Sequence, residues 1–363
     1  MKNQPESPKM VEEILQITHA IGELATMPMR FMEVCGTHTM SIFRHGLRSL
    51  LPKTLELVSG PGCPVCVTSQ EDIDRMIAFS LKEDVIVTTF GDLVRVPGSR
   101  TSLAKARASG AMVEIVYSPA SALEIARQNP DKQVVFLGVG FETTAPTVAA
   151  TILEADARDI RNFSVFSTHK VMPPTLDALF RDQELEIDGL LCPGHVSAII
   201  GARAYEKICQ EFDIPCVVAG FEPEDILRGV YHLVHQKVKG EARVENVYER
   251  AVTWEGNQNA CALMEKVFEK RDARWRGLGT IKGSGLAIRD DFSHLNAERR
   301  FDITVPETRE KKGCLCGEII RARALPLDCS LFGRVCTPTS PVGPCMVSSE
   351  GTCSAYYRYG GHA

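Results

Sequence analysis

Short apolar runs rich in β-branched residues alternate with longer amphipathic segments between residues 53 and 239. The runs predict strands, and the segments between them predict helices. A strand that is apolar along its whole length belongs in a parallel sheet covered on both faces, because neither face then meets water. The alternation therefore predicts an α/β fold built on doubly wound parallel sheets.

The expected strands are 55–59, 85–89, 112–117, 134–139, 163–168, 189–192 and 216–219. The expected helices between them are 71–81, 102–109, 120–128, 147–157, 175–180, 196–212 and 224–236. Similar sequences at two strand ends, 138–144 and 219–225, indicate two such α/β units. Helical periodicity also covers 10–24 and 249–270, whereas the sequence after residue 270 is irregular and punctuated by glycine and proline.

These patterns divide the chain into four parts. We expect an N-terminal segment at 1–52, a first α/β domain at 53–130, a second at 131–240 and a cysteine-rich C-terminal domain at 241–363. We expect the N-terminal segment to pack with the C-terminal part as a third domain, because Cys35 needs partners that the tail can offer. Since that tail has few regular elements, it needs a covalent or metal staple.

Composition excludes several classes of function. The formal net charge of −5 gives no electrostatic reason to expect binding to nucleic acid or to an anionic membrane. The N-terminus lacks the apolar core of a signal peptide, and no apolar run is long enough to span a bilayer, so we expect a cytoplasmic protein. Structural disulfides are disfavoured in that compartment, so the thirteen cysteines are expected to be ligands, catalysts and buried thiols.

Six of those cysteines lie within the last fifty residues, at Cys314, Cys316, Cys329, Cys336, Cys345 and Cys353. Four of them, at 314, 329, 336 and 353, form the pattern Cys-x14-Cys-x6-Cys-x16-Cys, which suits either a zinc ion or a [4Fe–4S] cluster. Zinc modules typically use close Cys-x2-4-Cys pairs, and this tail has none. The spacing therefore favours a [4Fe–4S] cluster on those four thiolates, with Cys316 and Cys345 as alternatives to Cys314 and Cys353.

Two further thiols form a Cys-x-x-Cys pair in the segment Gly-Pro-Gly-Cys-Pro-Val-Cys that ends at Cys66. Cys63 and Cys66 follow the expected strand at 55–59 and precede a helix expected to start near Ser69. The positive end of a helix dipole lowers the pKa of a nearby thiol, and this spacing predicts a reversible disulfide. Half of a zinc site is the alternative, but no matching second pair lies nearby.

Cys35 ends an apolar run and precedes a helical pattern that extends to residue 51. Either Thr37 or Thr39 could cap that helix, which would place Cys35 at its N-terminus as an accessible, reactive thiolate. His38 could act as a base, a ligand or an orienting donor. The alternative is an ordinary hydrogen-bonded histidine, so a functional role for His38 depends on Cys35.

Other loops at expected strand ends carry polar residues where doubly wound sheets bind ligands, namely Asp92, Arg95, Glu142, His169 and His195. These side chains could equally be helix caps and interdomain hydrogen bonds. The segment 138–144 is no dinucleotide fingerprint because the third glycine is missing, and the chain contains no phosphate-binding Gly-x4-Gly-Lys-Ser/Thr motif.

Six motifs occur in order along the chain: Cys-Gly-Thr-His-Thr, Gly-Pro-Gly-Cys-Pro-Val-Cys, Phe-Gly-Asp-x-x-Arg-Val-Pro-Gly, Gly-Phe-Glu-Thr-Thr-Ala-Pro, Pro-Gly-His-Val-Ser and Met-Val-Ser-Ser-Glu-Gly. Together they closely resemble the HypD family of hydrogenase-maturation proteins, over essentially the whole sequence. The resemblance implies a scaffold, formed with a small HypC-type partner, on which iron receives two cyanide ligands and one carbon monoxide. It further implies that cyanide arrives from HypE with HypF, and that the Fe(CN)2CO group passes to the large subunit of a [NiFe] hydrogenase.

The resemblance also implies an architecture and residue roles. It implies two similar α/β domains and a third with a [4Fe–4S] cluster, arranged rather like ferredoxin–thioredoxin reductase. By this likeness Cys35 holds the iron together with a HypC cysteine, and Cys63 and Cys66 form the redox pair. Cys314, Cys329, Cys336 and Cys353 correspond to the cluster ligands, while His38 and Glu350 occupy motif positions whose roles are less defined.

We therefore expect a maturation scaffold with redox activity, and we leave open whether it is an enzyme in its own right. A free-standing iron–sulfur dithiol–disulfide oxidoreductase is the alternative, and a zinc-stapled binding module is a third interpretation. Cys35 together with His38 favours the scaffold, because a simple thiol reductase needs no third, distant thiol.

Overall fold

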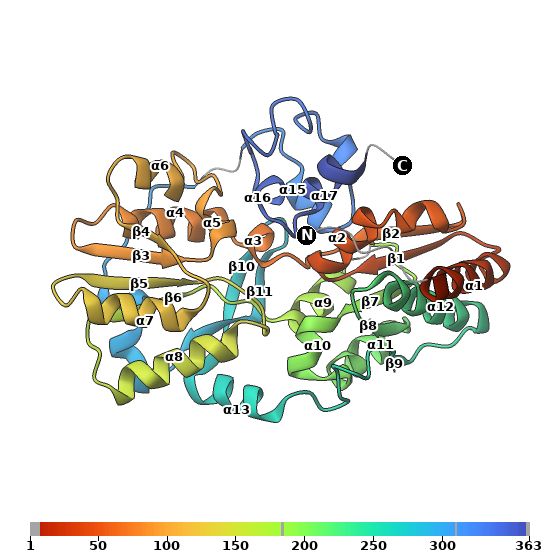
Figure 1. The fold of residues 1–363 in the computed structure, drawn as a ribbon, viewed down its shortest axis with the longest axis horizontal. Helices are drawn as coiled ribbons and strands as arrows, with labels where there is room; N and C mark the ends of the chain where they lie inside the picture. The colour runs from red at the N-terminus through yellow and green to blue at the C-terminus, as the bar shows by residue number, and fades with distance from the viewer. Residues whose placement is uncertain (1–7, 183–184, 309–310, 361–363) are drawn as a thin grey trace.

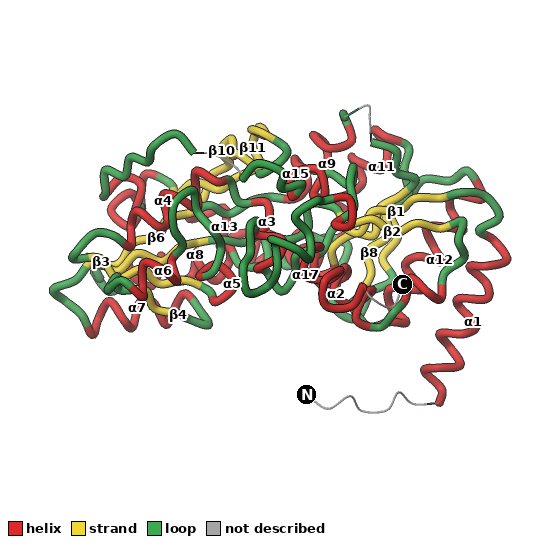
Figure 2. The backbone as a smooth tube through the Cα atoms, turned by 90° about the horizontal axis from the view of Figure 1, so that it is seen from above, coloured by secondary structure: helices red, strands yellow, loops and turns green. Residues whose placement is uncertain are grey.

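A computed structural model of the chain describes residues 8–182, 185–308 and 311–360. The molecule is elongated, with a parallel sheet toward each end and a β-hairpin between them (Figure 1). The C-terminal tail lies over the middle of the molecule beside the short helix α3 (Pro64–Val67). The view from above shows the same division along the long axis (Figure 2).

The first sheet contains five parallel strands in the order β2-β1-β7-β8-β9. These strands are β1 (Met29–Glu33), β2 (Leu55–Ser59), β7 (Gly189–Pro193), β8 (Cys216–Ala219) and β9 (Val244–Asn246). Strand β1 pairs with β2 on one side and with the central strand β7 on the other. Strands that precede residue 60 and strands that follow residue 188 therefore share one sheet.

Helices cover both faces of this sheet. One face packs against α1 (Pro8–Leu24) and α12 (Pro223–Lys239), with Phe31 and Leu191 in the buried layer between them. The opposite face, which includes Met32 and Leu190, packs against helices from the middle of the chain and against the tail. Those elements are α9 (Met172–Phe180), α10 (Gly194–Ile200), η2 (Ala202–Tyr205), α11 (Glu206–Phe212) and α15 (Cys316–Ile320).

The second sheet contains four parallel strands in the order β4-β3-β5-β6. They are β3 (Val85–Thr89), β4 (Val113–Ile115), β5 (Gln133–Gly138) and β6 (Phe163–Ser167). Its two faces are covered by α4 (Gln70–Ser80) and α6 (Leu103–Ala108) on one side and by α7 (Pro119–Gln128) and α8 (Ala145–Ala157) on the other. The predicted α/β fold with parallel sheets is confirmed.

An antiparallel hairpin, β10 (Phe268–Trp275) and β11 (Gly279–Ile288), lies between the two sheets. The expectation of few regular elements after residue 270 is therefore wrong for this segment. The helix expected at 249–270 is shorter and is confined to α13 (Gln258–Val267). The hairpin turns through two glycines with positive φ, Gly277 and Gly279. Because these strands carry charged side chains on an exposed face, they lack the continuous apolar pattern of the other strands.

The remaining described elements are short: α2 (Gly36–Arg44), η1 (Leu47–Leu50), α5 (Gly91–Val94), η3 (Asp290–Leu295), α14 (Ala297–Arg300), η4 (Pro326–Asp328), α16 (Pro344–Val347) and α17 (Thr352–Tyr359). The helix expected at 196–212 is interrupted, because Gly201 adopts a φ of 81° that an α-helix cannot accommodate. None of the helices in the described ranges is both long and apolar enough to cross a bilayer.

Candidate functional site

The carboxyl ends of β1 and β2 bring the three early cysteines together. The two strands are parallel neighbours with Glu33 opposite Ser59, so the loops that follow them leave from the same edge of the sheet. The N–H of Gly36 donates to the carbonyl of Gly62 at 3.1 Å. A Cβ atom added at Gly62 would lie 2.5 Å from the backbone nitrogen of Cys35. Only glycine permits this approach, which places Cys35 against the loop that carries Cys63.

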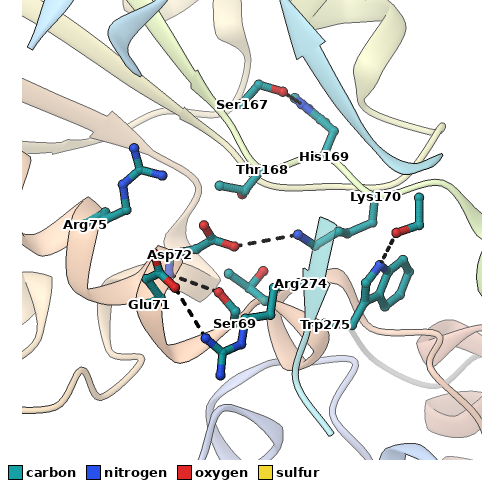
Figure 3. Close-up of polar contacts among 12 residues, drawn as sticks. Ser69, Glu71, Asp72, Arg75, Ser167, Thr168, His169, Lys170, Arg274 and Trp275 are labelled. Atoms are coloured by element: carbon teal, nitrogen blue, oxygen red, sulfur yellow. Dashed lines mark hydrogen bonds and ion pairs between the residues drawn. The ribbon is translucent and has the colours of Figure 1, made fainter. Parts of the chain in front are cut away.

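Cys63 and Cys66 form a disulfide, with their Cα atoms 5.2 Å apart. Cys63 is the N-cap of α3, and the N–H of Cys66 donates to its sulfur at 3.1 Å. The next helix, α4, begins after Ser69, whose hydroxyl accepts from the N–H of Asp72 (Figure 3). The predicted strand-to-helix turn, the start of the helix near Ser69 and the proximity of the two sulfurs are confirmed. The reversibility of the disulfide stays a prediction.

Cys35 occupies the N-cap position of α2, as its place in the sequence suggested, but its side chain is only 6% exposed. Burial raises the pKa of its thiol to about 12, and the nearby Glu350 carboxylate adds to the rise. Hydrogen bonds from the N–H groups of Thr37 and His38 act in the opposite direction and are outweighed. The expectation of an accessible thiolate is therefore wrong, because loss of solvation exceeds the effect of the helix end. Neither Thr37 nor Thr39 caps the helix.

Glu350 reaches this site from the loop between α16 and α17. Its carboxylate accepts a hydrogen bond from the hydroxyl of Thr37 at 2.9 Å. A Cβ atom added at Gly36 would lie 2.4 Å from the Cβ of Glu350, so the glycine allows the tail to lie directly on the first turn of α2. Burial raises the pKa of the Glu350 carboxyl above its ordinary value. The tail thus covers Cys35 and places a carboxyl beside it.

The side chain of His38 contacts the backbone at the end of β8. Its Nε2 donates to the carbonyl of Gly220 at 2.8 Å, and the carbonyl of Ala219 lies at 3.3 Å. Burial lowers the pKa of the imidazole to about 4, so the ring is neutral at physiological pH. The ring lies 4.8 Å from that of Phe221, and the exposed His195 stacks on the same phenyl ring at 4.0 Å. These contacts are those of an orienting donor that ties α2 to β8.

Glu33 places a buried carboxyl at the same edge of the sheet. It was not among the predicted site residues. Its side chain is fully buried, and one carboxylate oxygen accepts from the hydroxyl of Ser59 at 2.8 Å. Burial raises the pKa of the Glu33 carboxyl, and the charge of Arg48 partly opposes that rise. The second oxygen has no hydrogen-bond partner among the residues that the structure describes. The available signal was a glutamate within the otherwise apolar run at 31–34.

The six tail cysteines converge on the segment around Gly343. A Cβ atom added at Gly343 would lie 2.5 Å from the sulfur of Cys316 and 2.9 Å from that of Cys314. The thiol of Cys316 hydrogen-bonds with those of Cys314, Cys345 and Cys353. The two other cysteines contact backbone groups nearby: Cys336 accepts from the N–H of Val342 at 3.3 Å, and Cys329 donates to the carbonyl of Gly313 at 3.6 Å.

The chemical type of these ligands suits an iron–sulfur cluster, because they are soft cysteine sulfurs and most of them are buried. Within residues 8–182, 185–308 and 311–360, however, no three cysteine, histidine or carboxylate side chains are arranged to hold a metal ion. The thiols in mutual contact also include Cys316 and Cys345, which are not among the four expected ligands. The ligand set stays a prediction.

Two of the polar loop residues anchor the tail to the second sheet. Asp92 accepts hydrogen bonds from the hydroxyl groups of Ser348 and Ser349, and Arg95 donates to the carbonyl of Pro338 at 3.2 Å. Asp92 and Arg95 therefore make hydrogen bonds between distant parts of the chain, which was the alternative to a role in ligand binding. Asp92 thereby holds the two residues directly before Glu350, and Arg95 holds the tail at Pro338.

A buried ion pair links the helix that follows the disulfide to the end of β6 (Figure 3). The ammonium of Lys170 lies 3.6 Å from a carboxylate oxygen of Asp72, and the two side chains are 3% and 16% exposed. Burial lowers the pKa of Lys170, while Asp72 opposes that shift. The adjacent His169 is neutral, because burial and the charge of Lys170 lower its pKa to about 3, and its ring contacts the hydroxyl of Ser167. The ion pair therefore holds the first turn of α4 against the end of β6 in the second sheet.

Comparison with known proteins identifies the family. A sequence model described as "HypD: Hydrogenase formation hypA family" matches residues 9–360. The chain is 44% identical over 357 residues to "Hydrogenase maturation factor HypD" of Rhodobacter capsulatus, covering 97% of this chain and 95% of that protein. It is 48% identical over 338 residues to "Hydrogenase expression/formation protein HupD" of Azotobacter chroococcum mcd 1, covering 91% and 89%. It is 44% identical over 352 residues to "Hydrogenase maturation factor HypD" of Escherichia coli (strain K12), covering 97% and 94%. The chain therefore belongs to the HypD family.

Proposed function

We propose that this chain is a hydrogenase maturation factor that holds an iron centre at Cys35 while the centre receives its cyanide and carbonyl ligands. The observation that carries this proposal is the contact between three segments distant in sequence. The N–H of Gly36 binds the loop of Cys63, and the tail lies on the same turn through the contact between Thr37 and Glu350. A free thiol, a disulfide and a carboxyl thus meet at one edge of the first sheet.

Cys35 provides the chemistry that an Fe(CN)2CO group would require of its carrier. Thiolate is the soft anionic ligand that suits iron bearing cyanide and carbonyl ligands. The free thiol keeps its proton because burial raises its pKa to about 12. Iron binding would displace that proton, since the thiolate is the form that coordinates a metal. The site would therefore stay unreactive until the metal arrives.

The tail would hold a [4Fe–4S] cluster through Cys314, Cys329, Cys336 and Cys353, with Cys316 and Cys345 as the alternatives. The convergence of these thiols around Gly343 supports a cluster in this part of the chain. Such a cluster supplies single electrons when bound. The chain's own contribution is to place this region next to α3, which carries the disulfide, through the packing of α15 and α16 on that helix.

The partners follow from the same proposal. A HypC-type small protein would supply a second thiolate to the iron, HypE with HypF would deliver cyanide, and the large subunit of a [NiFe] hydrogenase would receive the finished group. These steps belong in the cytoplasm. Since Glu350 and the tail cover Cys35, the partner or the metal must displace this cover, and loss of the hydrogen bond between Thr37 and Glu350 would begin that movement.

The test is anaerobic co-purification with a HypC-type partner, followed by infrared spectroscopy in the cyanide and carbonyl stretching region. Cys35→Ala should still bind the partner but lose the cyanide and carbonyl bands. Cys209→Ala is the matched control, because it removes a buried thiol from α11, away from the strand edge, and should keep the bands. Bands of wild-type intensity in Cys35→Ala would place the iron elsewhere.

A free-standing dithiol–disulfide oxidoreductase is the second candidate, and the disulfide between Cys63 and Cys66 favours it. This function predicts that the chain alone reduces a disulfide substrate and that Cys35→Ala retains the activity. The maturation function predicts that Cys35→Ala is inactive in hydrogenase maturation even when the disulfide still cycles. One variant therefore separates the two.

A further inference from the structure

A cavity of about 720 Å³ lies between the two sheets, bounded by α9, α11, α13 and the β10–β11 hairpin. Its size falls in the range of pockets that bind small organic molecules. Most of its walls are apolar, from residues that include Pro173, Pro174, Ile208, Met264, Phe268 and Leu286. The thiols and carboxyls assigned to the iron site do not line it.

Three residues with a carboxyl group line this cavity, Glu142, Asp177 and Glu265, and of these Glu142 is the buried one. Glu142, in the loop after β5, is 1% exposed, and one of its oxygens accepts from the N–H of Met172 at 2.8 Å. Its other oxygen is buried and has no hydrogen-bond partner among the described residues. A buried carboxylate oxygen without a donor is costly, so a ligand that brings an N–H or O–H group would relieve a cost already present in the fold.

Two ammonium groups line the cavity from the hairpin. Lys270 on β10 and Lys282 on β11 are both exposed, and neither makes a close ion pair among the described residues, although the charge of Lys270 acts on Glu142. The other basic residues of the lining, Arg181 and Lys207, are both paired with Asp177 on α9. The hairpin lysines are therefore the available partners for an anionic group.

We propose that this cavity binds a small amphiphilic anion. Its aromatic or aliphatic body would lie against the apolar walls, an N–H or O–H group at one end would donate to Glu142, and an anionic group at the other end would lie beside Lys270 and Lys282. This inference does not depend on the proposed role of Cys35, because the two sites share no residue.

The probe for the test is 6-anilinonaphthalene-2-sulfonate, which has an aromatic body with an N–H group and a sulfonate at opposite ends. Anaerobic calorimetry on the full chain at pH 8 should give one saturable site. Ala178→Trp, which fills the cavity from α9, should abolish binding. Glu142→Gln should weaken binding about tenfold or more, because it replaces a charged acceptor with an amide. The matched ligand 6-phenoxynaphthalene-2-sulfonate, which lacks the N–H, should lose no affinity in Glu142→Gln.

The lysine contribution has its own control. The double variant Lys270→Ala with Lys282→Ala should bind several-fold more weakly, with a reduced dependence on salt concentration. Lys82→Ala with Lys105→Ala makes the same charge change at exposed lysines outside the cavity and should bind like wild type.

If Ala178→Trp fails to fold, alkylation of a cysteine in the wild-type chain provides an independent measurement of binding. Cys261 lines the cavity and is partly exposed, with its thiol donating to the carbonyl of Ile199 at 3.4 Å. Saturating probe should slow its alkylation by iodoacetamide, as followed by mass spectrometry. The proposal is overturned if binding is not saturable, if it is unchanged in both Ala178→Trp and Glu142→Gln, or if Cys261 gains no protection.

Discussion

The protonation state of Cys35 gives the sharpest test of the site. Burial and the nearby Glu350 raise the pKa of this thiol from 9.0 to about 12. Three pKa units correspond to about 4 kcal/mol of preference for the protonated form. At pH 7 the thiolate fraction is then about 1 in 10⁵, compared with about 1 in 100 for a thiol of ordinary pKa. Cys35 should therefore react very slowly with alkylating agents.

The assay is the rate of iodoacetamide alkylation at Cys35, measured by mass spectrometry between pH 7 and pH 10. Because only the thiolate reacts, the rate should rise about tenfold per pH unit without a plateau in this range. Cys192, which is fully buried in β7, reports unfolding in the same samples. A Cys35 rate that exceeds the Cys192 rate comes from the folded state.

Glu350→Gln separates the two causes of this shift. The amide can still accept from Thr37, but it removes a negative charge beside the thiol, so the Cys35 pKa should fall by about one unit or less and alkylation should become up to about tenfold faster. Glu318→Gln removes a 45% exposed carboxylate from α15 and should leave the rate unchanged. A plateau with a midpoint at or below pH 9 in wild type would refute the argument that burial keeps Cys35 protonated.

Three further predictions concern other parts of the structure. Cys66→Ser should leave one additional alkylatable thiol, at Cys63, under mildly oxidising conditions, and equal labelling of wild type before and after reduction would contradict a reversible disulfide. Lys170→Met should lower the free energy of unfolding by about 3 kcal/mol in urea denaturation, because it leaves the largely buried Asp72 unpaired, and adding Asp72→Asn should restore part of that loss. The Glu142 carboxyl has a folded-state pKa raised from 4.5 to about 7 by burial, so its contribution to stability is fully present below pH 4.5 and is lost as the pH rises to about 7. Wild type should therefore lose about 3 kcal/mol across this range relative to Glu142→Gln, and parallel pH profiles of the two proteins would count against that shift.

The strands were the most predictable part of the fold. The expected ranges at 55–59, 85–89 and 216–219 coincide with β2, β3 and β8, because a fully apolar run of this length can be stabilised only inside a covered sheet. The partners of these strands were not predictable from local sequence. Since β1 pairs with β7 as well as with β2, the centre of the first sheet forms only after more than half of the chain has been made.

The site shows the same division between local and long-range information. The helix start at Cys35 and the close pair at Cys63 and Cys66 are local, and the sequence located them. The burial of Cys35 depends on the distant Glu350 loop, which no local pattern places on Gly36. The buried carboxyl of Glu33 was visible as a charge in an apolar run, but its partner Ser59 lies on a different strand.

The protonation of Cys35 also bears on the choice between scaffold and reductase. Thiol–disulfide exchange requires a thiolate to attack a disulfide sulfur, and its rate falls with the thiolate fraction. With a pKa of about 12, Cys35 is a poor nucleophile toward the disulfide of Cys63 and Cys66, although it lies against the same loop. A metal ion overcomes this barrier by displacing the proton, because coordination favours the thiolate directly. The arrangement therefore supports the proposed role of Cys35 in metal binding over a role in disulfide turnover, because a proposed carrier of a reactive iron group needs a thiol that stays inert until the metal arrives.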